Sequence, residues 1–181
     1  LRRCLENYNL NIVFWKKWSY PLENCMVAIV ENKSITEHIK KNTTEINKDF
    51  IIYDNFIKTL EKRKLSIIKK LNRFVEQHGK ICILGAGHLS IAFISLLQLT
   101  DYISYAIDDN DNKSGYFLPV GNIPIKKTKF LNACNTKLCL LGANPQHHNK
   151  IKNNLKIFLD NGGIICSIFP NTVDYLEDIL K

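Results

Sequence analysis

The sequence contains no run approaching the roughly 20 apolar residues that cross a membrane, and its longest apolar runs have only the length of a strand. Its 6 cysteines include no CxxC pair, and no ligands occur at the spacing of a zinc finger. We therefore expect neither a disulfide framework nor a metal site. No signal peptide is visible, which favours a reducing, cytoplasmic compartment. Because the chain opens with Leu1 and has 1 methionine, Met26, we expect it to be a piece of a longer protein.

Basic residues exceed acidic ones, 25 to 17, and give a formal net charge of +8 with a pI of about 9.2. Lysine is nevertheless spread along the whole chain, and the tight basic clusters are Arg2-Arg3 and residues 62–64, the second inside a helical pattern. Such a spread predicts solvated faces rather than a nucleic-acid site. With 45% hydrophobic and 23% charged residues the chain has the balance of a folded domain. We expect neither nucleic acid nor a membrane as a partner.

Most of the cysteines lie inside apolar, strand-like runs of the sequence. These are Cys25, Cys82, Cys139 and Cys166. A free cysteine in such a run packs as a small hydrophobic side chain, so we expect these four to serve the core and not to react.

Residues 49–79 carry the strongest helix pattern in the chain. Apolar residues recur mostly three or four positions apart, and a glycine follows where a helix commonly ends. At about 1.5 Å per residue, such a helix would be about 45 Å long. Residues 1–48 are less regular, with expected strands at 11–15 and 25–30 and a capping box at 34–37 that predicts a short helix.

From residue 80 onward, strand-like and helix-like segments alternate. The strand-like runs are continuously apolar, as in strands that are buried on both faces. The fold class that this pattern predicts is α/β, a Rossmann-like three-layer domain with a parallel sheet, preceded by the long helix and a short N-terminal strand segment. The expected strands are residues 80–84, 102–107, 138–141 and 164–168.

Residues 85–90 read Gly-Ala-Gly-His-Leu-Ser and connect the first of these strands to its helix. In such a fold the turn places backbone N–H groups and a helix N-terminus at the carboxyl edge of the sheet, which favours a phosphate or another anion. The third glycine of a dinucleotide fingerprint is replaced by a serine that is small enough for close packing. A tight turn that binds nothing is the alternative. The candidate binding residues of the turn are Gly85, Ala86, Gly87, His88 and Ser90.

Asp108 and Asp109 end the second strand, about 20 residues beyond the glycines, where an acidic side chain suits a ribose hydroxyl. A solvated loop explains them equally well. His88 could touch a phosphate or act as an acid or base, but the sequence places no partner beside it. His147 and His148 are expected at the surface. Since no Ser-His-Asp set, paired carboxylates or P-loop can be assembled, no catalytic residue is assigned.

Residues 108–125 read Asp-Asp-Asn-Asp-Asn-Lys-Ser-Gly-Tyr-Phe-Leu-Pro-Val-Gly-Asn-Ile-Pro-Ile. This segment resembles the C-terminal domain of SAM-dependent sugar C-methyltransferases, in which a strand ending in Asp is followed by Lys-Gln-Gly and then by Pro-Gly-Thr-His-Ile-Pro-Ile. The other features of that domain occur in the same order, with a long helix before a Gly-Ala turn, a buried strand followed by Asn144, and a Gly-Gly, strand and Pro at the end. The residues that match the segment are Lys113, Gly115, Pro119, Ile123, Pro124 and Ile125.

The resemblance implies a division of labour. In the family a middle domain binds SAM and supplies the base, and the C-terminal domain closes over a nucleotide-linked sugar. It implies that residues 1–48 are the remnant of a preceding methyltransferase domain and a linker, 49–79 a connecting helix and 80–181 the C-terminal domain. SAM would then be bound outside this chain, which would not be catalytic alone. The resemblance adds Lys113, Tyr116 and Asn144 to the candidate substrate-binding residues.

The sequence also departs from the family's pattern, and three other functions stay open. Residues 89–91 read Leu-Ser-Ile where many family members carry Lys-Gly-Asn, so a basic residue that could meet a diphosphate is missing. A free-standing nucleotide-binding module is one alternative, similar to the first domain of sugar N-acyltransferases, although no hexapeptide repeats follow. NAD binding is another, weakened by the missing third glycine. The third is a structural domain whose long helix mediates contacts between domains or subunits, including a homo-oligomer.

Overall fold

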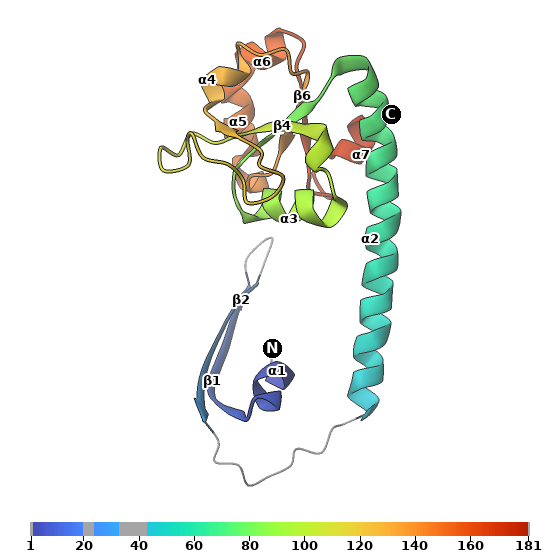
Figure 1. Ribbon diagram of the computed structural model, residues 1–181, viewed down its shortest axis with the longest axis vertical. Helices are drawn as coiled ribbons and strands as arrows, with labels where there is room; N and C mark the ends of the chain where they lie inside the picture. Colours follow the sequence, from blue (N-terminus) through green and yellow to red (C-terminus); the bar gives the residue numbers. More distant parts are fainter. Residues whose placement is uncertain (1, 20–23, 33–42, 181) are drawn as a thin grey trace. The chain divides into compact units, whose positions relative to one another are not determined.

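The structure is a computed structural model in which residues 2–19, 24–32 and 43–180 are described (Figure 1). Within these residues the chain divides into two compact units, Leu1–Ile52 and Tyr53–Lys181. Each unit is described by itself. Among the described residues, no helix is both long and apolar enough to cross a membrane.

The first unit is built around an antiparallel hairpin of β1 (Leu10–Ser19) and β2 (Asn24–Asn32), preceded by the short helix α1 (Arg2–Asn7). Its strand side chains are exposed or half-buried, so the described hairpin buries little apolar surface. Cys25 is exposed, and the expectation that it packs in a core is wrong. Its neighbours Asn24, Met26 and Val27 are exposed too, so neither face of this end of β2 is buried. The expected helix at 34–37 lies outside the described residues.

Helix α2 (Thr43–His78) begins earlier than the expected residue 49 and ends where the sequence predicts. Gly79 follows with a φ of +78°, and its N–H donates to the carbonyl oxygen of Val75 at 2.8 Å. This left-handed conformation is the usual helix stop, which glycine adopts without steric cost. Within the second unit, the last turns of α2 bury Ile67, Leu71 and Phe74.

The described part of the second unit contains one five-stranded, all-parallel sheet with the order β5-β4-β3-β6-β7. The chain fills one half of the sheet from β3 outward and then returns to fill the other half, which is the order of a Rossmann fold. The expected α/β class with a parallel sheet is therefore confirmed. The strands are β3 (Ile81–Leu84), β4 (Ile103–Ile107), β5 (Ile125–Lys126), β6 (Leu138–Leu141) and β7 (Ile164–Ser167).

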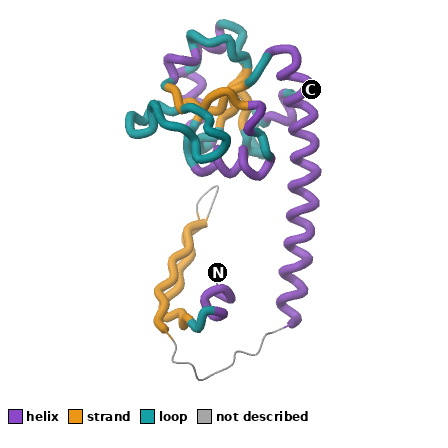
Figure 2. Tube along the Cα trace, viewed as in Figure 1, coloured by secondary structure: helices purple, strands orange, loops and turns teal. Residues whose placement is uncertain are grey.

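Helices cover both faces of the sheet, as Figure 2 shows for the strands enclosed between helical segments. One core cluster joins the sheet to α2, α3 (His88–Leu97) and α7 (Leu176–Ile179). The other joins it to α4 (Thr128–Leu131), α5 (His148–Asn154) and α6 (Lys156–Asp160). Neighbouring residues of a strand point to opposite faces, so Ile81 and Ile83 belong to the first cluster and Cys82 to the second. Cys82, Cys139 and Cys166 are buried, as expected.

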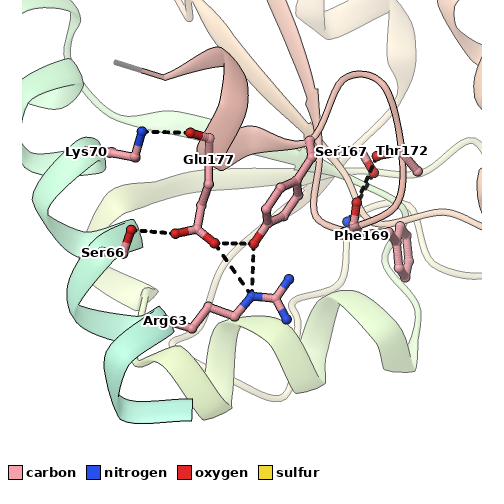
Figure 3. Close-up of polar contacts among 8 residues, drawn as sticks. Arg63, Ser66, Lys70, Ser167, Phe169, Thr172 and Glu177 are labelled. Atoms are coloured by element: carbon pink, nitrogen blue, oxygen red, sulfur yellow. Dashed lines mark hydrogen bonds and ion pairs between the residues drawn. The ribbon is translucent and has the colours of Figure 1, made fainter. Parts of the chain in front are cut away.

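A polar cluster fastens α2 to the C-terminal helix α7 (Figure 3). Arg63 Nε donates to the Tyr175 hydroxyl at 2.9 Å, and that hydroxyl donates in turn to the Glu177 carboxylate. Ser66 also donates to this carboxylate, and Lys70 donates to the Glu177 carbonyl oxygen at 2.7 Å. Burial and the hydrogen bond to Glu177 raise the pKa of Tyr175 to about 12, so the phenol, which is protonated at neutral pH in any case, keeps its proton into more alkaline solution. The part of α2 that follows Ile52 is thus an integral part of the second unit.

Candidate functional site

The candidate site lies where the strand order of the sheet reverses, at the carboxyl ends of β3 and β6. The chain leaves β3 through the glycine turn and leaves β6 through Gly142 and Ala143. In open parallel sheets ligands bind in the crevice at this switch point, because the connections on its two sides diverge to opposite faces. The topology therefore directs attention to the loops after β3, β4 and β6.

Gly85 brings the turn into close contact with the neighbouring loop. Its φ is +102°, and its N–H donates to the carbonyl oxygen of Ile107 at 2.8 Å. A Cβ added at this position would lie 3.1 Å from the backbone nitrogen of Ala143. Both the positive φ and the short distance to Ala143 therefore favour glycine at this position, and the turn packs closely against the loop after β6.

Ser90 occupies the position of the missing third glycine and is fully buried. A Cβ added at Gly142 would lie 3.1 Å from Ser90 Cβ and would overlap the Ser90 hydroxyl. The close approach of α3 to β6 thus relies on a glycine in β6's loop instead of one in the helix. Among the described residues the Ser90 hydroxyl has no hydrogen-bond partner. Ser90 lies beneath the turn as a packing residue, and its role as a ligand contact stays a prediction.

The Asp108 carboxylate connects three separate parts of the site. Oδ2 accepts from the Ala86 N–H at 3.0 Å and from Lys113 Nζ at 2.9 Å. Oδ1 accepts from the Asn110 N–H at 3.0 Å. Burial acts to raise the pKa of Asp108, but the hydrogen bonds from Lys113, Asn110 and Ala86 outweigh it and hold the pKa below its ordinary value. The ionised carboxylate therefore fixes the glycine turn and the Lys113 side chain to the end of β4.

These bonds also bear on the expected ribose contact. A carboxylate has about four lone-pair sites, and the bonds from Ala86, Asn110 and Lys113 use most of them. In this arrangement the Asp108 carboxylate accepts hydrogen bonds from other residues of this chain, and few of its lone pairs are left to accept from ligand hydroxyl groups. Asp109 is also engaged, because Oδ1 accepts from the Thr128 N–H at 2.8 Å and Oδ2 from the Thr128 hydroxyl at 2.7 Å.

A cavity of about 220 Å³ opens between the glycine turn, the end of β4 and helix α5. It contains Gly85, Asp108 and Asp109 from the set predicted from sequence, and so brings the turn and the paired aspartates to the same edge of the sheet. Its remaining lining is mostly apolar. The other residues around it are Leu84, Ile107, Thr128, Ala143, Ile151, Asn154 and Leu155.

The other predicted residues lie near the site but outside this cavity. Gly87 caps α3 with extended backbone, and His88 is exposed in the first turn of that helix. The Tyr116 side chain is 67% exposed on the loop after β4. Asn144 caps the 3₁₀ turn at Pro145–His147 by accepting from the Gln146 N–H at 3.0 Å. Their roles as ligand contacts stay predictions.

Sequence reasoning missed the α5 wall of the cavity. Ile151 and Leu155 are four positions apart and so share a helix face, which a periodicity argument could have found. Nothing in the sequence says that this face meets the ends of β3 and β4. No sequence signal distinguishes Asn154, which reaches the cavity, from its neighbour Asn153.

His148 is buried, and the expectation that it lies at the surface is wrong. Its Nε2 makes a hydrogen bond of 2.9 Å to the carbonyl oxygen of Ala143, an atom that can only accept. The ring of Phe169 lies 6.1 Å away, centroid to centroid. His148 thus supports the loop that forms one wall of the cavity. His147, by contrast, is exposed as expected.

Comparison with known proteins places this arrangement in a family. Among the residues that the structure describes, no group of three or more His, Cys, Asp or Glu side chains is arranged to hold a metal ion. A search of curated proteins found no match. A family model, the C-methyltransferase C-terminal domain, matches residues 26–170, which include the helix α2, the whole parallel sheet and the crevice. The resemblance seen in the sequence is confirmed, and the chain belongs to the family of C-methyltransferase C-terminal domains.

Proposed function

We propose that this chain is the substrate-binding domain of a SAM-dependent C-methyltransferase and that its substrate is a nucleotide-linked sugar. Membership of the family supports the methyltransferase context. The observation that carries the substrate proposal is the cavity at the switch point, which lies directly beside a glycine turn that opens a helix. Such a pairing suits a ligand with a ring at one end and a phosphate next to it.

The diphosphate would lie outside the cavity, against the start of α3. The N–H groups of the first turn point out of that helix end, and Lys113 is held beside the turn by Asp108. Lys113 thereby supplies a positive charge that the sequence lacks at Leu89, where many family members carry lysine. A lysine contributes to phosphate binding as a point charge, so its origin in a different loop does not matter for the interaction.

SAM would supply the methyl group, and we propose that it is held by a domain outside this chain. The carboxylate that would take a cofactor's ribose hydroxyls is Asp108, and its lone pairs are largely used by Ala86, Asn110 and Lys113. The described residues therefore do not fit a ribose of SAM or NAD in the usual pose of this fold. Within the enzyme, the chain's own task would be to bind and orient the acceptor.

Titration calorimetry with the full chain tests this proposal. We expect dTDP-glucose and UDP-glucose, used as probes, to give measurable heats and SAM to give none. A Lys113→Ala variant should weaken binding of both sugar nucleotides by about tenfold to a hundredfold, since a charge-assisted contact contributes about 1.5–3 kcal/mol. The matched control Lys129→Ala changes an exposed lysine in α4 that does not contact Asp108 and should bind as the wild type does. Absence of binding by both sugar nucleotides would contradict the proposal.

A second role is favoured by the first half of α2, which exposes large apolar side chains. They are Phe50, Ile51, Ile52, Tyr53 and Phe56. Contiguous apolar exposure of this kind marks contact surfaces, so the helix would also mediate contacts between domains or subunits. In sedimentation experiments, Phe56→Glu should lower any self-association of the chain, whereas Lys58→Glu, an exposed charge on the same helix, should affect it less. If both variants self-associate to the same extent, the apolar residues of α2 do not mediate the contact.

A further inference from the structure

The cavity at the switch point has room for one ring system and not for a whole nucleotide sugar. Its volume is about 220 Å³, below the roughly 300–1,000 Å³ of pockets that enclose a drug-sized ligand. If the proposed function holds, part of the substrate occupies the cavity and the rest lies outside it. The lining decides which part.

Charge excludes the diphosphate from the cavity. Asp108 and Asp109 both line it, and in each carboxylate both oxygens accept hydrogen bonds. Lys113 does not line the cavity; it donates to Asp108 at 2.9 Å and keeps two further N–H donors for a phosphate at the turn. Beside a partly apolar wall the effective dielectric constant is lower than in bulk water, so two negative groups there would repel a phosphate more strongly than they would in solution. The phosphates are therefore better placed at the turn, on the outer side of Gly85.

Apolar walls disfavour the sugar ring in the same space. Leu84, Ile107, Ile151 and Leu155 present side chains that cannot replace the water around sugar hydroxyl groups. Each hydroxyl buried without a partner costs about 1–3 kcal/mol. A nucleobase has the opposite character, because its two faces are apolar and its hydrogen-bonding groups lie at its edge.

The polar groups of the lining are placed to meet such an edge. The Asn154 side chain offers a donor and an acceptor, and among the described residues it makes no hydrogen bond. Asp109 and Thr128 add polar groups to the lining from other elements, at the end of β4 and the start of α4. A carboxylate accepts from the N–H donors of a base, and each Asp109 oxygen has a second lone pair beyond its bond to Thr128.

We infer that this cavity is the nucleobase subsite of the substrate, with Asn154 as a residue that contacts the base edge. The inference rests on the proposed function and adds to it the place of the base. It makes the α5 wall, and not the glycine turn, the part of the site that discriminates between nucleotides. The base could belong to a sugar nucleotide or to an adenine-containing cofactor; we commit to the sugar nucleotide, and the experiment separates the two sources.

Two exposed, adjacent asparagines in α5 give a matched pair of variants. Asn154 lines the cavity and Asn153 does not. We expect Asn154→Trp to cover the cavity and to weaken binding of dTDP-glucose and of thymidine by about tenfold or more, the value of a lost pocket contact. Asn153→Trp should bind both probes as the wild type does. A second pair, Ile151→Trp in the lining and Ile157→Trp on the exposed side of α6, tests the apolar wall in the same way.

Saturation-transfer NMR with the full chain identifies the part of the probe that is buried. For dTDP-glucose we expect the strongest saturation on the thymine protons and the weakest on the glucose protons. Adenosine and SAM should show weaker transfer than thymidine.

Three results would overturn the inference. If dTDP-glucose binds the wild type and Asn154→Trp equally well, the proposed function stands and the base subsite is wrong. If the glucose protons receive the strongest saturation, the cavity holds the sugar. If neither sugar nucleotides nor thymidine bind, the proposed function and the subsite fail together.

Discussion

At the scale of single residues, the packing of the site depends on the contact between Ser90 of α3 and Gly142 in the loop after β6. In this chain Ser90 stands where a helix glycine would allow close approach to the sheet, and Gly142 makes room for it from the opposite side. The contact therefore tolerates a serine hydroxyl but no additional Cβ in the loop after β6.

Gly142→Ala should destabilise the domain, because the added Cβ would overlap the buried Ser90 hydroxyl. Overpacking of this kind costs about 1–3 kcal/mol of the free energy of unfolding. Urea denaturation followed by circular dichroism measures the change. Gly87→Ala is the control, since a Cβ there meets nothing within 4 Å, and it should cost less than about 1 kcal/mol. A Ser90→Gly substitution should rescue Gly142→Ala, and failure of this rescue would contradict the proposed contact.

The Asp108 carboxylate should make the stability of the domain depend on pH. Its pKa is lowered in the folded state: burial acts to raise it, and the bonds from Lys113, Asn110 and Ala86 prevail. The folded-state pKa lies below the ordinary value of about 3.9, so these bonds stabilise the fold above about pH 4, and their contribution disappears as pH falls through the lowered pKa.

Replacement of this carboxylate by an amide tests the pH dependence. Asp108→Asn should lose about 1–3 kcal/mol of the free energy of unfolding at pH 7 and should lose less on further acidification than the wild type does. Denaturation curves between pH 3 and 7 provide the comparison. The exposed Asp160 in α6 serves as the control, because Asp160→Asn should follow the wild-type curve within about 0.5 kcal/mol. A parallel fall of the Asp108→Asn and wild-type curves would show that the carboxylate is not the source.

At the scale of elements, α2 has two parts with different surroundings. Its last turns pack into a core cluster together with α3 and α7, and polar contacts to Tyr175 and Glu177 fasten it there (Figure 3). The apolar residues of its first half are exposed. Sequence periodicity predicts the helix from residue 49 onward but cannot show this difference, because both halves carry apolar residues at helical spacing.

Two leucines of α2 allow a comparison between the buried and the exposed side of the helix. Leu71 is 0% exposed and Leu65 is 69% exposed. Leu71→Ala should lower the free energy of unfolding by about 2–5 kcal/mol, through lost burial and the cavity left behind. Leu65→Ala should change it by no more than about 0.5 kcal/mol. Chemical denaturation of both variants gives the values, and equal losses would mean that α2 does not dock as described.

At the scale of the whole molecule, the second unit is expected to be stable without the first. Among the described residues, its two core clusters draw none from before Leu60, and the apolar burial that they describe around the parallel sheet lies within Tyr53–Lys181. The hairpin of the first unit has mostly exposed side chains, and a two-stranded hairpin is marginally stable at best on its own.

A shortened chain that starts at Tyr53 should fold cooperatively. We expect its thermal midpoint to stay within about 4 °C of that of the full chain, the shift that corresponds to about 1 kcal/mol in a domain of this size. Its affinity for dTDP-glucose should be unchanged if the cavity is the binding site. Calorimetry measures both quantities. Loss of the cooperative transition would show that the first unit contributes to the core of the second.

Much of this architecture was predictable. Each strand expected in the second unit is present within about two residues of its predicted ends, because a strand buried on both faces must be continuously apolar. β5, with its residues Ile125–Lys126, is too short to leave such a pattern and was missed. The division of the chain into a domain remnant, a connecting helix and a C-terminal domain stays a prediction. Cys25 and His148 were placed wrongly because burial depends on what covers a position, which local sequence does not record.

The sequence by itself determined the alternation of strands and helices, the glycine turn and the family, since these follow from local pattern and from motifs in a fixed order. Tertiary structure alone decided that Asp108 bonds to its own chain, that Ser90 is a packing residue, and that α5 closes the cavity with Ile151 and Asn154. The reason is physical: hydrogen-bond partners and pocket walls come from segments distant in the chain, and only the folded sheet brings the ends of its strands to a common edge.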